Sequence, residues 1–201
     1  MVTVRTMVDG TSDEATTEMA LAAGRGDRAA AGAFIRATQR DVWRFLTHLA
    51  GSADAEDLTQ ETFVRALRSL PTFSARSHAR VWLLAIARRV AVDHVRAAMS
   101  RPRLSAGEDW QAAAERLPAA QLPGVDVTVA LGQALRMLSP DRREAFVLTQ
   151  VIGLAYAEAA QACGCPVGTI RSRVARARRD LANALGEGRR RVPAPRISQS
   201  M

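Results

Sequence analysis

A proline-containing segment, residues 100–126, divides the sequence into two stretches whose apolar residues repeat with the period of an α-helix. The segment carries three prolines and little periodicity, which is typical of a linker between domains. The stretch before it, residues 26–99, contains a single proline, and the alternation of a β-strand persists nowhere in the chain. We therefore predict an all-α protein of two small helical domains joined by a flexible linker.

The predicted domain boundaries follow from these changes in pattern. Residues 1–25 are expected to be a disordered N-terminal segment, because the first part of the chain is rich in threonine and acidic residues. The two domains are expected at residues 26–99 and 127–186, and residues 187–201 are expected to be a disordered basic tail. With 48% apolar residues, the chain has enough apolar surface to bury a core.

The charge of the chain is strongly basic and unevenly distributed. The formal net charge is +8, and all 28 basic residues are arginine. Residues 54–61 carry four acids and no base, whereas residues 76–103 carry seven arginines and one aspartate, and residues 171–191 carry eight arginines and two acids. A basic surface favours an anionic partner such as nucleic acid or an acidic protein surface, and one acidic and two basic patches indicate more than one macromolecular contact.

The second domain ends in a helix-turn-helix pattern. The sequence predicts a short helix over Tyr156 to Cys163, a tight turn at Gly164, and Pro166 in the first turn of a second helix. On that second helix, one narrow stripe is apolar and is expected to pack on a core: Ile170, Val174, Ala177 and Leu181. The opposite face combines small residues with arginines, which suits a helix lying in the major groove of DNA.

Within this helix we expect some residues to contact base edges and others to contact phosphates. Ser172 and Arg176 are placed to meet base edges, and arginine can pair bidentately with guanine. The flanking arginines are better placed for phosphates: Arg171, Arg173, Arg178 and Arg179. The alternative is a plain helical hairpin with a charged, solvated face.

A second basic helix is predicted in the first domain, from Ala79 to Arg96. It pairs an apolar face with a face of arginines, and it follows a short polar loop that contains Phe73, Arg76 and His78. Cations that follow a phosphate backbone, beside a pocket for an unstacked base, are typical of single-strand binding. The alternative is that Phe73 and Trp82 are ordinary core residues.

An acidic helix precedes this loop in the sequence. Ser52 is a plausible N-cap, and acids occupy the first turn, where they suit the helix dipole. Phe63, Ala66 and Leu67 are expected on its core side, and its polar side is expected to carry Asp57, Gln60 and Glu61. This polar side is either a solvated face or a docking surface for a basic partner.

Three blocks of this sequence together resemble one protein family. They are "DAEDLTQETFVRAL", then "FSARSHARVWLLAIARRVAVDHVR", then "LSPDRREAFVLTQVIGLAYAEAAQACGCPVGTIRSRVARARRDL". In this order and spacing they resemble the sigma-70 family of bacterial RNA polymerase sigma factors. The chain looks like the small extracytoplasmic-function (ECF) class, which keeps only regions 2 and 4, and within that class like the actinobacterial sigma-C subgroup.

The resemblance implies a role for each surface. The acidic helix would dock on the β′ clamp helices of core RNA polymerase through Asp57, Gln60 and Glu61, and the β flap would be a second polymerase contact. The first domain, as region 2, would recognise the −10 element and capture a flipped base of the non-template strand, with these candidates: Phe73, Arg76, His78, Arg80, Arg88 and Arg89. The second domain, as region 4, would read the duplex −35 element, with these candidates: Thr169, Arg171, Ser172, Arg173, Arg176 and Arg179.

The expected function therefore involves no covalent chemistry, no cofactor and no metal, and the chain is not expected to be an enzyme. Core polymerase would fix the spacing of two weak DNA contacts, which would then act together. No apolar run is long enough to span a membrane, so a cytoplasmic protein is expected. Whether an anti-sigma factor binds the chain is left open by the sequence.

Two other functions are compatible with parts of the pattern. A DNA-binding activator would use the helix-turn-helix, but it needs neither the acidic helix nor the second basic helix. A redox sensor would use Cys163 and Cys165, although Cys163 also suits a small packing position, and the pair offers too few ligands for a zinc site.

Overall fold

The computed structural model describes residues 12–100, here called the first half, and residues 125–190, the second half. The predicted linker, apart from its ends, and the tail from residue 191 lie outside the described residues. The first half contains four α-helices: α1 (Asp13–Gly24), α2 (Arg28–Ala50), α3 (Ala55–Ser69) and α4 (Ala79–Ser100). The second half contains four more: α6 (Val125–Met137), α7 (Pro140–Phe146), α8 (Tyr156–Cys163) and α9 (Val167–Arg190).

The described residues form helices and no strand, which confirms the all-α prediction. A short 3-10 helix, Leu70–Thr72, follows α3, and a π-helical turn, Val147–Val151, continues α7. None of the described helices is long and apolar enough to cross a membrane.

Helix α1 corrects the prediction of disorder for residues 13–24, while residues 1–11 lie outside the described residues. Ser12 caps the helix by accepting a hydrogen bond from the backbone N–H of Ala15, and Asp13 and Glu14 suit the positive end of its dipole. Thr16 and Ala20 are buried against the remainder of the first half. The sequence signal for this helix is weak because its buried side consists of small residues. Helix α9 likewise extends to Arg190, past the predicted end of its domain at residue 186.

The end of α1 lies so close to the backbone of Leu70 that only glycine fits there. A Cβ atom on Gly24 would lie 2.6 Å from the backbone carbonyl oxygen of Leu70. Because that neighbour is backbone, we expect Gly24→Ala to lower the free energy of unfolding by roughly 1–3 kcal/mol. Chemical denaturation measures the change, with Gly132→Ala as the control, since its Cβ would approach only the Arg136 side chain, at 3.9 Å. Equal stability of the two variants would contradict the close approach.

The helix-turn-helix forms where the sequence predicts it. Gly164 has a left-handed backbone (φ 65°, ψ 39°) that ends α8 and allows α9 to start within a few residues. The predicted apolar stripe of α9 is buried throughout: Ile170, Val174, Ala177 and Leu181. Helix α3 begins later than its predicted cap, because Asp54 rather than Ser52 occupies the N-cap position.

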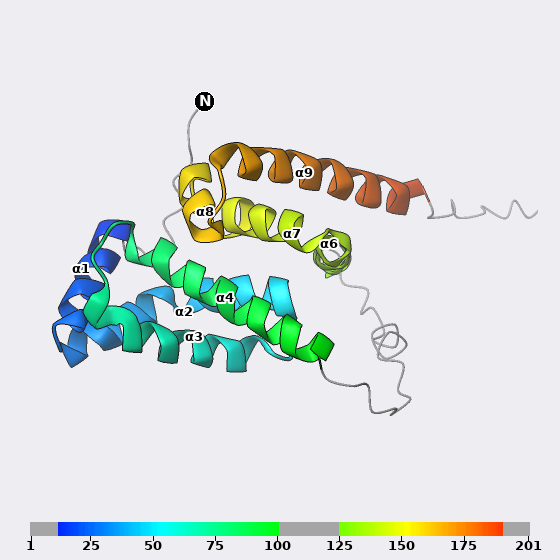
Figure 1. Ribbon diagram of the computed structural model, residues 1–201. Helices are drawn as coiled ribbons and strands as arrows, with labels where there is room; N and C mark the ends of the chain where they lie inside the picture. Colours follow the sequence, from blue (N-terminus) through cyan, green and yellow to red (C-terminus); the bar gives the residue numbers. More distant parts are fainter. Residues whose placement is uncertain (1–11, 101–124, 191–201) are drawn as a thin grey trace, which may run out of the picture.

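The two halves pack against each other. Helix α4 lies between α2 and α3 on one side and the α7–α8 region on the other, as Figure 1 shows. One continuous cluster of buried residues includes Phe34 and Leu83 from the first half and Leu148 and Ile170 from the second. The sequence predicted two helical domains joined by a linker and made no prediction of a contact between them. The contact forms because α4 is apolar on more than its predicted core face: Val81 and Leu84, beside Arg80 and Arg88, are also buried.

Candidate nucleic-acid interface

Helix α9 presents most of the predicted −35 residues to solvent. Arg171, Ser172, Arg176 and Arg179 are exposed, while Thr169 and Arg173 are half-buried. Arg173 is already engaged, because its Nη2 lies 2.5 Å from the Oδ2 of Asp141 on α7. Since the opposite face of α9 is buried, these exposed cations share the side of the helix that is free to approach a duplex.

The predicted polymerase-binding residues form an exposed acidic face on α3. Asp57, Gln60 and Glu61 are all exposed. Leu67, expected on the core side, is instead 39% exposed, and Val64 is 41% exposed. Apolar side chains in water beside acids are typical of a protein-docking surface.

Arg65 fixes one edge of this acidic face. Its Nε donates to Glu61 at 2.7 Å, and its Nη1 donates to Asp93 of α4 at 2.8 Å. The two bonds hold α3 against α4 and orient the Glu61 carboxylate, which remains about half exposed.

Five of the six predicted −10 residues fall into two groups, and Phe73 belongs to neither. Arg76 and Arg89 are exposed and are free to meet an anionic strand. Phe73 is half-buried, and its ring lies 4.8 Å from that of Trp82, centroid to centroid, at an interplanar angle of 41°. This pair packs against the core, in agreement with the alternative that the two aromatic residues are structural.

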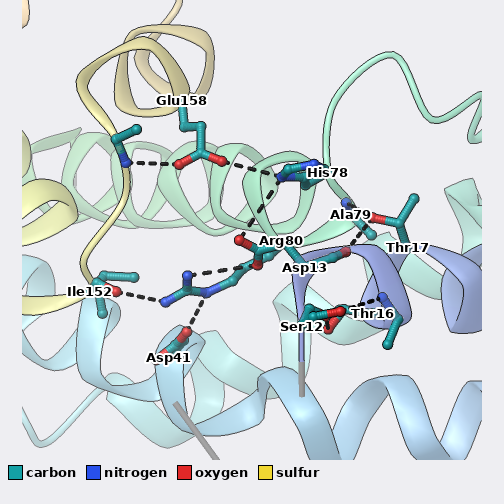
Figure 2. A network of polar contacts seen from close by, with 12 residues as sticks. Ser12, Asp13, Thr16, Thr17, Asp41, His78, Ala79, Arg80, Ile152 and Glu158 are labelled. Carbon is teal, nitrogen blue, oxygen red and sulfur yellow. Dashed lines mark hydrogen bonds and ion pairs between the residues drawn. The ribbon is translucent and has the colours of Figure 1, made fainter. Parts of the chain in front are cut away.

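Arg80 belongs to the second group, whose members contact the second half. Its side chain is only 13% exposed, and its Nε lies 2.6 Å from the Oδ2 of Asp41, a buried residue of α2. Its Nη2 donates to the backbone carbonyl of Ile152 at 2.6 Å, as Figure 2 shows. Arg80 therefore joins α2, α4 and the turn that precedes α8.

Arg88 forms an ion pair across the same contact. Its Nε lies 2.5 Å from the Oε1 of Glu144 on α7, although neither atom has a hydrogen bond of ordinary geometry within the described residues. Burial raises the pKa of Glu144, and the nearby Arg88 only partly opposes that rise. Burial opposes the charge of Arg88, yet Glu144 and its neighbours together raise the Arg88 pKa. The pair is thus a partly buried charge contact between the halves.

His78 is the third member of this group. Its Nδ1 lies 3.2 Å from Glu158 Oε1 on α8 and 3.9 Å from Asp13 Oδ2 on α1. The structure therefore brings three −10 candidates, His78, Arg80 and Arg88, against the second half. The sequence did not single out their partners, because acids separated by many residues give no signal until the chain folds.

The two cysteines differ in environment. Cys163 is buried, and burial together with the nearby Glu144 raises the pKa of its thiol to about 12. Cys165 is half-buried, and its Sγ lies 4.0 Å from Nη1 of Arg173. These environments fit a packing role for Cys163.

We expect iodoacetamide at pH 8 to modify Cys165 and to leave Cys163 unmodified in the folded chain. With a pKa of about 12, only about one Cys163 thiol in ten thousand is ionised at pH 8, and the thiolate is the reactive form. Peptide mass spectrometry measures the two sites, and both should react once the chain is unfolded in guanidinium chloride. Equal modification of the two thiols in the folded protein would contradict the prediction.

Comparison with known proteins agrees with this arrangement. The family description "Sigma-70 region 2" matches residues 34–101, and "Sigma-70, region 4" matches residues 128–181. The chain is 53% identical over 166 residues to the "Probable RNA polymerase sigma-C factor" of Mycobacterium bovis, covering 83% of this chain and 89% of that protein. It is 36% identical over 152 residues to "ECF RNA polymerase sigma factor BldN" of Streptomyces coelicolor, covering 74% of this chain and 58% of that protein.

Two solved structures share the fold. The sigma factor RpoE of Bartonella quintana, in complex with the anti-sigma factor NepR, has a TM-score of 0.60 and 29% identity, covering 77% of this chain and 96% of that one. CnrH, in complex with the cytosolic domain of CnrY, has a TM-score of 0.66 and 24% identity, covering 86% and 97%.

A helical unit with an acidic exposed face, followed by a helix-turn-helix with a basic outer face, agrees with these matches to a transcription initiation factor of two modules. The chain belongs to the sigma-70 family of RNA polymerase sigma factors, in the extracytoplasmic-function class. Within that class its similarity is to the sigma-C subgroup, as the sequence blocks predicted. Members of this family initiate transcription.

Proposed function

We propose that each surface of this sigma factor has a separate contact. The acidic face of α3 binds the β′ clamp helices of core polymerase through Asp57, Gln60 and Glu61. The exposed face of α9 reads the duplex −35 element. The loop before α4 and the basic face of α4 recognise the −10 element and capture an unpaired non-template base. These contacts take place in the cytoplasm, and the solved anti-sigma complex of the Bartonella protein makes an anti-sigma factor a further candidate partner.

The main support for this proposal is that α9 and α3 each expose their predicted binding face while their opposite face is buried in the core. Four −35 candidates are solvent-exposed on a helix whose opposite stripe is fully packed. The three acidic-face residues are likewise exposed on a helix whose Phe63 and Ala66 are buried. A duplex-binding activator would need the first face only.

The contact between the halves adds a step to this function. His78, Arg80 and Arg88 are held by Glu158, the Ile152 carbonyl and Glu144 respectively. His78 and Arg88 lose these contacts when the second half moves away from α4, whereas Arg80 keeps its ion pair with Asp41 of the first half. Polymerase binding would supply the free energy for this separation by holding the two halves at the spacing of the promoter elements.

Run-off transcription with core polymerase tests the proposed function. We expect promoter-specific RNA when the chain is added to core polymerase, and none from either component alone. The chain alone should bind promoter duplex weakly and should not open it, which permanganate reactivity of unpaired thymines measures. Occupation and opening of the promoter by the isolated chain would overturn the proposal.

A further inference from the structure

Three possible metal ligands from distant parts of the chain converge where the two halves meet. Asp13 is in the first turn of α1, His78 precedes α4, and Glu158 is in the first turn of α8. Their ligand atoms all lie within 4.8 Å of one another, and all three residues are half-buried. Figure 2 shows His78 in contact with both Asp13 and Glu158. We propose that Asp13, His78 and Glu158 bind a divalent cation of the Zn²⁺ class, which links the two halves of the chain.

The donor set and its spacing suit such an ion. One imidazole nitrogen and two carboxylate oxygens are ligands that Zn²⁺ takes at about 2.0–2.2 Å, so neighbouring ligands of a tetrahedral ion lie about 3.3 Å apart. The Nδ1 of His78 lies 3.2 Å from Glu158 Oε1 and 3.9 Å from Asp13 Oδ2. Modest side-chain rotation therefore completes three ligand positions, and water can take the fourth.

Hydrogen bonds from His78 cannot satisfy both carboxylates of the cluster. Both carboxylates approach the same ring nitrogen, and Nδ1 can offer a single hydrogen. Arg80 also faces the cluster, because its Nη1 lies 3.8 Å from the second oxygen of Asp13. Arg80 already binds Asp41 and the Ile152 carbonyl through its other nitrogens. A cation between the two carboxylates can bind both of them at once, which a single Nδ1 hydrogen cannot do.

Neighbouring groups hold two of the ligands in place. The second oxygen of Glu158 accepts the backbone N–H of Ala155 at 2.8 Å, which fixes the plane of the carboxylate. The hydroxyl of Thr17 donates to the Asp13 carbonyl at 2.7 Å and accepts the backbone N–H of Ala79 at 3.0 Å. Thr17 therefore ties the start of α1 to the residue that follows His78. Such support is what orients the ligands of metal sites in proteins.

The position of the site means that a bound ion would affect the contact between the two halves. Asp13 and His78 belong to the first half and Glu158 to the second, so a bound ion favours the arrangement in which the halves are in contact. It also occupies His78, a −10 candidate, and this last consequence rests on the proposed function. The ion-binding claim itself needs neither DNA nor polymerase.

Equilibrium dialysis and titration calorimetry of the full, metal-free chain with ZnCl₂ test the site. We expect one Zn²⁺ per chain and at least about tenfold weaker binding in each of Asp13→Asn, His78→Gln and Glu158→Gln. Weaker Zn²⁺ binding in variants of both halves would show that the ion bridges them. The double variant Cys163→Ser, Cys165→Ser should bind Zn²⁺ as the natural chain does, which separates this site from the thiols.

His94→Gln is the matched control. The Nε2 of His94 lies 3.4 Å from Asp54 Oδ2, so it is a histidine beside one carboxylate rather than two. Unchanged Zn²⁺ affinity in this variant supports the proposal. Absence of stoichiometric binding, or an equal loss in His94→Gln, would overturn it. Run-off transcription by the metal-free chain is measured separately, so failure of the metal site and failure of the sigma function give different results.

Discussion

Replacing Asp57 and Glu61 together by arginine is expected to weaken binding of core polymerase by at least about 100-fold, because like charges opposed across an interface cost several kcal/mol. Both carboxylates are exposed on α3 beside the exposed Val64 and Leu67. Binding of labelled chain to core polymerase measures the loss. Binding of duplex −35 DNA, which we propose takes place through α9, should persist in the same variant.

The control for this result is the triple variant Glu18→Arg, Ala29→Arg, Gln39→Arg. All three residues are exposed on α1 or α2, outside the acidic face, and together they change the net charge by the same amount as the α3 variant. Polymerase binding by this control should remain within about threefold of the natural chain, because only long-range electrostatics changes. An equal loss of polymerase and duplex binding in the α3 variant would mean that the two surfaces do not act separately.

Arg88→Met is expected to destabilise the folded chain by about 3 kcal/mol at pH 8. The Arg88 side chain is 29% exposed, but its partner Glu144 is 7% exposed and would be left as a buried, unpaired carboxylate. Chemical denaturation measures the change. Arg89→Met, an exposed arginine on the same helix, should alter stability by less than about 0.5 kcal/mol.

The loss of stability in Arg88→Met should become smaller as the pH falls. Burial raises the pKa of Glu144, so its contribution to stability is present below the ordinary glutamate pKa and is lost as the pH rises through the folded-state value. Removing Arg88 removes the main influence that lowers this pKa, so Glu144 holds its proton to higher pH in the variant. The variant should therefore lose less stability at pH 5 than at pH 8. Arg88→Met with Glu144→Gln should recover most of the loss at pH 8, and a pH-independent loss would contradict the buried-charge explanation.

Local patterns predicted the parts of the site that depend on one helix. The four-residue stripe of α9 is buried as predicted because a helix with apolar residues on one side has only one way to face a core. The turn at Gly164 followed from the conformational freedom of glycine. By contrast, Leu67 was assigned to the core by its angle on α3, and it is instead 39% exposed.

Local patterns were less informative for α1. Its buried Thr16 and Ala20 are small, so its apolar face is weak, and its place in the fold depends on the close approach that Gly24 allows. A helix of this kind is stabilised by the surface that it packs against rather than by its own sequence.

The sequence alone determined the helical class, the order of the two modules, the helix-turn-helix and the separation of acidic from basic surfaces, because each is encoded by residues within a few turns of one another. Only the tertiary structure decided that α4 packs against α8, that Arg88 meets Glu144, and that Asp13, His78 and Glu158 come together. Those contacts join residues many positions apart, and their partners are fixed by the packing of whole helices. A pattern read along one helix carries no information about which distant carboxylate will lie opposite its arginines.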